Sequence, residues 1–103
     1  MLTVIVQFKV GDSARVEALK QAFAASVPRY QQVPGLLRKY YLLSDDGDTA
    51  GGVYLWKTRA DAEALYTNEW KQMIKAKYGS EPDLSYFESP VIVDNQYGET
   101  HIE

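Results

Sequence analysis

The chain has 103 residues and no cysteine, and 14 acidic against 11 basic side chains give it a net charge of −3 at pH 7. This length predicts one domain, and the absence of cysteine excludes disulfides, thiolate metal sites and a thiol nucleophile. The acidic balance argues against nucleic acid or an anionic membrane as a partner. The amino-terminal apolar run is too short for a membrane span and has no basic leader, so we expect a cytoplasmic protein.

The first half of the chain changes from a strand pattern to a helix pattern. Apolar and polar residues alternate over 2–8, which predicts a strand. Apolar residues at helical spacing over 11–27 predict a helix, with Asp12 or Ser13 as its N-cap. Pro28 should kink this helix or start a separate turn, because proline has no backbone N–H.

A hairpin is predicted next. The second strand covers 36–43, the third covers 51–56, and Asp46 with Gly47 forms the tip of the turn between them. The strand over 36–43 has apolar or aromatic residues of both parities, so neither of its faces is plainly a solvent face.

The rest of the pattern predicts a second helix and a fourth strand. Thr58 and Asp61 resemble a capping box. Apolar residues then recur at helical spacing, with a break near Asn68. The fourth strand is expected over 84–93.

The order strand-helix-strand-strand-helix-strand predicts an α+β, ferredoxin-like (βαββαβ) domain over 1–95, followed by a polar C-terminal tail over 96–103. In this fold a four-stranded antiparallel sheet carries both helices on one face. The other face stays bare, and a second copy of the chain would cover it. We therefore expect a homodimer that forms a dimeric α/β barrel.

The third predicted strand carries two rings on one face, since Gly52, Tyr54 and Trp56 share a parity. Glycine within a strand often marks the close approach of another group. One interpretation is therefore a cavity beside Tyr54 for a flat aromatic ligand, enclosed by Tyr66 or Trp70 of the second helix. The other is that both rings are large core residues of a small protein.

The basic residues near these strands, Arg38, Lys39, Lys57 and Arg59, are expected to be solvated charges at strand edges and caps. We single out Arg38, because it shares a face with Tyr40 and would set a cation beside a phenolate or enolate.

No metal or cofactor site is indicated. His101 is the single histidine and lies in the predicted tail. Asp45, Asp46 and Asp48 do not have the spacing of a calcium loop and fit a solvated hairpin. Neither a phosphate loop nor a dinucleotide fingerprint is recognisable. We expect a protein without cofactor or metal.

Two quoted segments carry a family resemblance: "VPGLLRKYYLLS" over 33–44 and "AGGVYLWKTRADAEALY" over 50–66. From about the first strand to Asn95, the chain resembles the YdhR-type monooxygenases of the dimeric α/β-barrel superfamily, which includes antibiotic-biosynthesis monooxygenases. The resemblance implies a homodimer with one pocket per subunit and oxygenation without metal or flavin. Trp56 matches a pocket-lining tryptophan of the antibiotic-biosynthesis branch, whereas Gly52 stands where that branch can have asparagine.

Two classes of function stay open. The first is a cofactor-independent monooxygenase of a small aromatic or enolisable substrate, phenolic or polyketide-like. The second is a non-catalytic small-molecule-binding or structural dimer. RNA recognition uses the same strand order with rings on the third strand, but the acidic charge opposes it. On the first hypothesis, Tyr54 and Arg38 are catalytic, and the substrate-binding residues are Gly52, Trp56, Tyr40, Tyr66 and Trp70.

Overall fold

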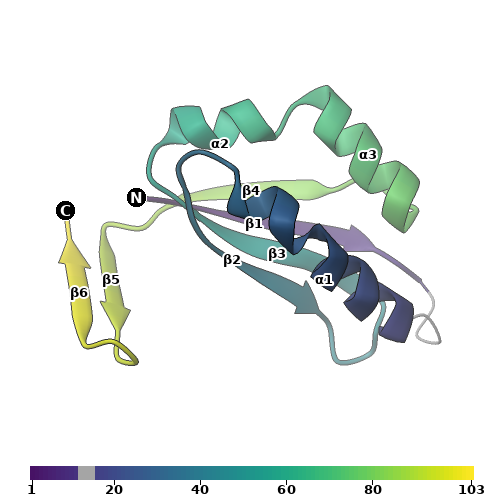
Figure 1. The fold of residues 1–103 in the computed structure, drawn as a ribbon, viewed down its shortest axis with the longest axis horizontal. Coiled ribbons are helices and arrows are strands. Elements are labelled where there is room, and N and C mark those ends of the chain that lie inside the picture. The colour runs from purple at the N-terminus through teal and green to yellow at the C-terminus, as the bar shows by residue number, and fades with distance from the viewer. Residues whose placement is uncertain (12–15) are drawn as a thin grey trace.

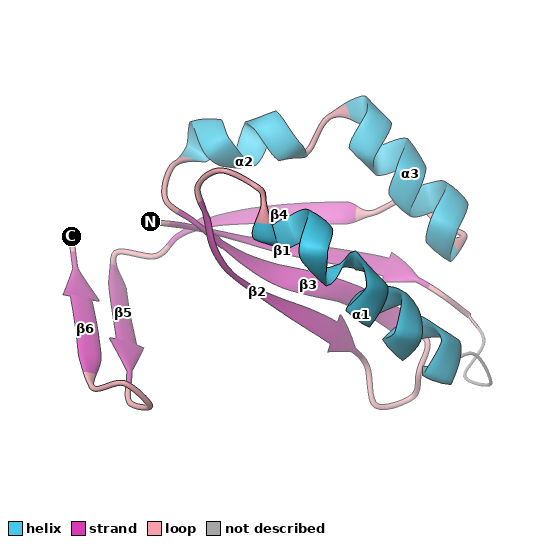
Figure 2. Cartoon of the chain, in the orientation of Figure 1, coloured by secondary structure: helices cyan, strands magenta, loops and turns pink. Residues whose placement is uncertain are grey.

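The computed structural model describes residues 1–11 and 16–103. Its main sheet is antiparallel, with the strand order β2-β3-β1-β4. The helices cover one face of this sheet and leave the other bare (Figure 1, Figure 2). The elements are β1 (Leu2–Lys9), α1 (Val16–Gln31), β2 (Leu36–Leu43), β3 (Thr49–Trp56), α2 (Arg59–Leu65), α3 (Asn68–Tyr78) and β4 (Asp83–Glu88). The predicted ferredoxin-like α+β fold is therefore confirmed.

The helices follow the sequence signals closely. The expected break near Asn68 divides the second helix into α2 and α3, and each begins at a threonine cap. Thr58 accepts a hydrogen bond from the backbone of Asp61, and Thr67 accepts one from the backbone of Trp70, both at 3.1 Å. α1 continues through Pro28, so this proline does not start a separate turn. The N-cap expected at 12–13 lies outside the described residues.

The predicted fourth strand over 84–93 is wrong in its extent. β4 ends at Glu88, and β5 (Val91–Asp94) leaves the sheet to pair with β6 (Glu99–Ile102). Pro90 lies at the break, where a residue without an N–H cannot extend the strand ladder. The segment expected to be a polar tail therefore supplies β6. The resulting hairpin projects beside the sheet (Figure 1).

The core lies between the sheet and the helices. Leu2, Val4, Val6 and Phe8 of β1 are all buried, as the alternation predicts. They pair with residues of β3 in register, for example Val4 with Tyr54. One face of the sheet thus packs under the helices, as the sequence pattern indicated.

A β-bulge changes which residues of β2 face this core. Leu36 pairs with Trp56, but Arg38 pairs with Leu55, so one residue is inserted between two ladder positions. After the bulge, Lys39 pairs with Tyr54 and shares its face. The inner and outer faces of β2 are therefore reversed relative to simple alternation from Leu36.

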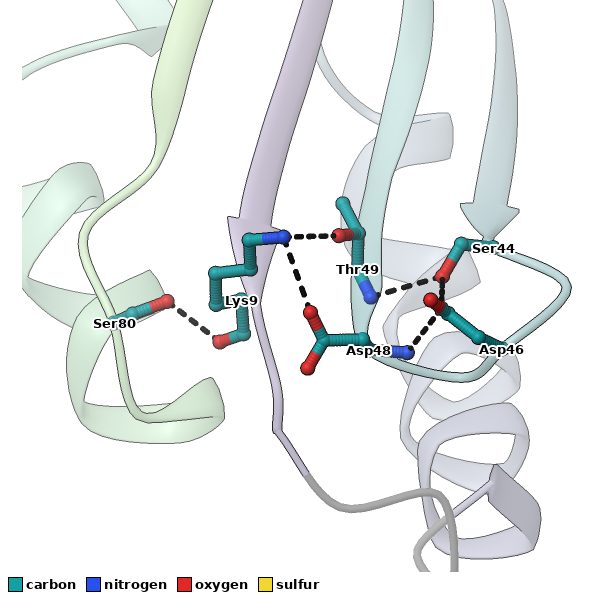
Figure 3. A network of polar contacts seen from close by, with 6 residues as sticks. All are labelled: Lys9, Ser44, Asp46, Asp48, Thr49 and Ser80. Atoms are coloured by element: carbon teal, nitrogen blue, oxygen red, sulfur yellow. Dashed lines mark hydrogen bonds and ion pairs between the residues drawn. The ribbon is translucent and has the colours of Figure 1, made fainter.

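The turn between β2 and β3 uses its carboxylates locally (Figure 3). Asp46 Oδ1 accepts hydrogen bonds from Ser44 Oγ at 2.7 Å and from the backbone N–H of Asp48 at 2.9 Å. Asp48 forms an ion pair with Lys9 at 3.1 Å. Among residues 1–11 and 16–103, no group of three or more potential ligands is placed to hold a metal ion. In the same residues, no helix has both the length and the apolarity to cross a membrane.

Candidate functional site

Four of the expected site residues form one aromatic cluster in the core. Tyr54 and Trp56 of β3 pack against Tyr66 and Trp70, and all four side chains are buried. The ring centres of Tyr54 and Tyr66 are 5.5 Å apart, and Trp56 Nε1 donates a hydrogen bond to Tyr66 Oη at 3.0 Å. Because both β3 rings face the helices, they do not form the open-face platform on which RNA-recognition folds stack bases.

The space beside Gly52 is filled by neighbouring side chains. A Cβ atom at this position would lie 3.0 Å from Tyr54 Cε1 and 3.3 Å from Lys39 Cε. The missing side chain therefore makes room for the lysine stem to lie along the inner face of the sheet. The expected room for a flat ligand beside Tyr54 holds Lys39 in this structure.

Lys39 is surrounded by aromatic rings. Its Nζ lies 3.4 Å from the ring centre of Tyr30, 3.8 Å from that of Tyr41 and 4.7 Å from that of Tyr54. These are favourable cation–π distances. The expectation that Lys39 is a solvated edge charge is wrong, because the bulge turns its side chain inward, where it is half-buried.

The surroundings of Lys39 are cationic and apolar. Burial, followed by the nearby charges of Lys77 and Arg29, lowers the pKa of Lys39 from 10.5 to about 7. No carboxylate of the described part of the chain lies within ion-pair distance of its Nζ. Burial also raises the pKa values of Tyr54 and Tyr66 far above neutrality, so both phenols remain protonated. Lys39 is thus the titratable group among these rings that changes its charge near pH 7.

Arg38 and Tyr40 lie on the opposite face of the sheet from Tyr54. Arg38 Nη1 donates a hydrogen bond to Tyr40 Oη at 3.2 Å, and Arg38 Nη2 forms an ion pair with Asp94 at 3.0 Å. The hydrogen bond from Arg38 holds the pKa of Asp94 below its ordinary value. The seven residues expected to share one site are therefore divided between the two faces, and the cation that lies among the inner rings is Lys39.

Two hollows meet at Lys39. A small inner cavity of about 20 Å³ lies between the helices and the sheet, which is room for about one water molecule. An open groove of about 350 Å³ lies between α1 and β2, and Arg38 is among its lining residues. Both hollows are lined by Tyr30, Lys39 and Tyr41. The arrangement can present a cation or a neutral amine to a molecule in the groove.

The sequence offered only an indirect signal for Lys39. Leu36 and Leu37 are consecutive apolar residues, and a strand that is apolar at both parities is compatible with a bulge. The position of the inserted residue depends on the pairing with β3, which one strand alone does not reveal.

Comparison with known proteins gives one family and several related folds. The sequence model of the family described as "Putative mono-oxygenase ydhR" matches residues 4–87. No curated protein matches the chain.

Three solved structures illustrate the shared fold. A "putative antibiotic biosynthesis monooxygenase" from Deinococcus radiodurans is 12% identical, with a TM-score of 0.69 over 91% of this chain and 97% of that chain. One described in the same words from Nitrosomonas europaea is 23% identical, with a TM-score of 0.64 over 86% and 98%. A monooxygenase from the ActVA-Orf6 gene of Streptomyces coelicolor, in complex with Nanaomycin D, is 18% identical, with a TM-score of 0.63 over 91% and 92%.

Proposed function

Because this chain belongs to the ydhR mono-oxygenase family, we propose that it is a cofactor-independent monooxygenase of a small aromatic or enolisable substrate, phenolic or polyketide-like. The family and the structural neighbours support a monooxygenase role. The observation that carries the proposal is the groove between α1 and β2, where a lysine among tyrosine rings meets open space. The Streptomyces coelicolor neighbour, solved in complex with Nanaomycin D, supports a small molecule as the occupant.

The proposed chemistry needs little from the protein beyond binding and electrostatics. A phenolate or enolate is electron-rich enough to pass an electron to O₂, and radical recombination then forms the carbon–oxygen bond. Over the whole reaction a ring CH₂ becomes C=O, one oxygen atom of O₂ enters the product and the other leaves as water. The substrate supplies all the electrons. The protein must bind the anion, shield it from water and stabilise its charge.

In this proposal the expected site residues lie at different distances from the substrate. Arg38 is among the residues that line the groove, while its guanidinium pairs with Asp94 on the bare face. Tyr54 and Trp70 line the inner cavity behind the groove, and Trp56 and Tyr66 pack against these two rings. Gly52 leaves room on the inner face for the stem of Lys39. Since the inner cavity is only about 20 Å³, a ring reaches Tyr54 after side chains rotate, as often occurs on binding. Tyr40 lies on the bare face and supports Arg38.

Oxygen uptake tests the proposal. Chelator-treated protein is mixed with hydroxyanthrones, naphthols and dihydroxynaphthalenes, and O₂ consumption is followed with an electrode beside product formation by mass spectrometry. We expect uptake above the autoxidation rate, with one atom of ¹⁸O from ¹⁸O₂ in the product. Heat-denatured protein is the control. A rate equal to autoxidation across the whole panel would contradict the oxygenase proposal.

We also propose that two copies pack through the bare sheet face. Leu37, Tyr40 and Phe87 lie on or beside this face and are at least half-exposed, at 50%, 55% and 53%. The terminal hairpin adds exposed Val91 and Val93. An apolar surface of this kind is costly in water, and a two-fold axis would cover it on both copies. Light scattering should give the mass of a dimer, and Phe87→Glu should give a monomer. A monomeric wild type would overturn this part of the proposal.

The second candidate is a non-catalytic ligand-binding or structural dimer of the same fold. The packing of the core favours it. Within the described residues, every buried side-chain nitrogen and oxygen has a hydrogen-bond partner, and the inner cavity has room for about one water molecule. Such a core does not need a ligand to be satisfied. If the protein is a ligand-binding dimer, aromatic probes should bind without any O₂ uptake.

A further inference from the structure

We infer that Lys39 is the group that recognises the substrate's hydroxyl: it accepts the proton of an acidic phenol or enol in the groove and then holds the oxyanion as its ammonium ion. The inference deepens the proposed oxygenase function and rests on it. It assigns a catalytic role to a residue that sequence analysis placed among solvated charges.

The position of Lys39 makes this contact geometrically available. β2 is an edge strand of the sheet, and the groove opens between this edge and α1. Lys39 lines both the groove and the inner cavity. Its stem lies over Gly52, and its Nζ lies among the rings of Tyr30, Tyr41 and Tyr54. A planar ligand in the groove would therefore meet the Nζ atom with its oxygen and the tyrosine rings with its own ring.

The charge around Lys39 favours an anion. Arg29 and Lys77 line the cavity with Lys39, and among the described residues no acidic side chain pairs with any of the three. Tyrosine rings attract a cation but do not neutralise it. An oxyanion would supply the missing negative charge. At a desolvated position, the attraction between an ammonium ion and an oxyanion is strongest when the two groups are in direct hydrogen-bonding contact.

The protonation state of Lys39 allows it to act first as a base. Its pKa of about 7 means that the neutral amine is well populated at neutral pH. The amine lone pair takes the hydroxyl proton of the ligand, so that the O–H bond breaks, a third N–H bond forms and an ammonium–phenolate pair results. This step needs no oxidant or reductant. A general base works best when its pKa is close to the operating pH.

Three of the phenols near Lys39 have pKa values that burial raises, so they do not titrate with it. The groups that face it or line the cavity with it are Arg29 and Tyr30 from α1, Tyr41 from β2, Tyr54 from β3, and Lys77 and Tyr78 from α3. Burial raises the pKa values of Tyr41 and Tyr54, and that of Tyr78 to about 12. These phenols stay neutral when Lys39 titrates.

Binding of 4-nitrophenol tests the inference, because its phenolate absorbs visible light and its phenol does not. At a pH where the free probe is mostly phenol, wild-type protein should convert the bound probe to phenolate. Lys39→Met should lower the affinity at least about tenfold and remove the colour change. Lys39→Arg keeps a cation without an accessible base, so it should still hold phenolate, but each phenol converted on binding should release its proton to the solvent, which a pH electrode in weak buffer detects, whereas the neutral amine of wild type takes up that proton itself. Lys57→Met, which removes an exposed lysine, is the matched control and should bind as wild type does.

Lysine labelling gives an independent readout on wild-type protein, in case Lys39→Met folds poorly. Reductive dimethylation at pH 7 reaches neutral amines, so Lys39 should react faster than Lys57 and should be protected by 4-nitrophenol. Unchanged labelling of Lys39 with the probe present would overturn the inference. So would equal probe affinity and colour in wild type and a folded Lys39→Met variant.

Oxygen uptake separates this inference from the function on which it rests. Phenolate binding that depends on Lys39, together with no O₂ uptake on any phenol, would overturn the oxygenase proposal and support Lys39 as the anion site. Undiminished O₂ uptake by Lys39→Met would support the oxygenase proposal and overturn the role of Lys39.

Discussion

Replacing Lys39 by methionine should stabilise the protein at neutral pH. Methionine has a similar length and no charge, so it can fill the same path over Gly52 and among the three rings. The wild-type lysine must either bury a charge beside Arg29 and Lys77 or release its proton. Both options cost free energy of folding, and methionine removes the cost.

The magnitude follows from the change in pKa. A fall from 10.5 to about 7, at about 1.4 kcal/mol per pKa unit, sets an upper limit of about 5 kcal/mol. Lys39 is only half-buried, so solvent screening reduces this figure. The lost cation–π attraction of about 0.5–1 kcal/mol reduces it further. We therefore expect Lys39→Met to stabilise the fold by about 1–3 kcal/mol at pH 6–7.

The sign of the pH dependence is also determined. The folded-state pKa of Lys39 lies below the unfolded value, so between about pH 7 and 10.5 the unfolded chain binds more protons. The stability contributed at this residue therefore rises with pH through that window. Below pH 7 both states are protonated and the full penalty applies. The advantage of the methionine variant should be largest near pH 6 and should fade toward pH 10.

Urea denaturation followed by tryptophan fluorescence measures this difference. Wild type, Lys39→Met and the exposed-site control Lys57→Met are unfolded at pH 6, 7, 8 and 9, and the free energies of unfolding are subtracted pairwise. Subtraction removes the contributions of the other titratable groups. A Lys39→Met variant that is less stable than wild type at pH 6, or a difference that does not change with pH, would refute the reasoning.

Three further outcomes are expected. Gly52→Ala should destabilise the fold by about 1 kcal/mol, since its Cβ would lie 3.0–3.3 Å from its neighbours; an unchanged midpoint of denaturation would contradict this. Tyr66→Phe should cost about 1–3 kcal/mol, because it removes the acceptor for the buried Trp56 Nε1. Tyr97→Phe, at an exposed position, should cost little in the same assay. Arg38→Met should speed amide hydrogen exchange in β5 with little change in global stability, because its ion pair with the hairpin is exposed; equal exchange rates would count against that role.

Local patterns in the sequence determined the order of elements. The alternation over β1, the threonine caps before α2 and α3, and the turn at Asp46 all act within a few residues, where backbone geometry and hydrogen bonding set the outcome. A four-stranded sheet under helices follows from that order and the handedness of its crossovers. The aromatic cluster could also be predicted from the sequence, because four rings lie on the apolar faces of their predicted elements: Tyr54, Trp56, Tyr66 and Trp70.

Only the tertiary structure decided which side chains meet. The bulge after Leu36 is a property of the pairing between β2 and β3, and one inserted residue exchanges the faces of every residue that follows. It sends Arg38 to the bare face and Lys39 into the core. The end of β4 likewise depends on its pairing with β1, because Glu88 is opposite Leu2, the first residue of that strand. Pro90, which has no N–H to donate, follows two residues later. Periodicity within one strand carries no information about its partner's register, so the lysine at the groove became visible only when the strands were paired.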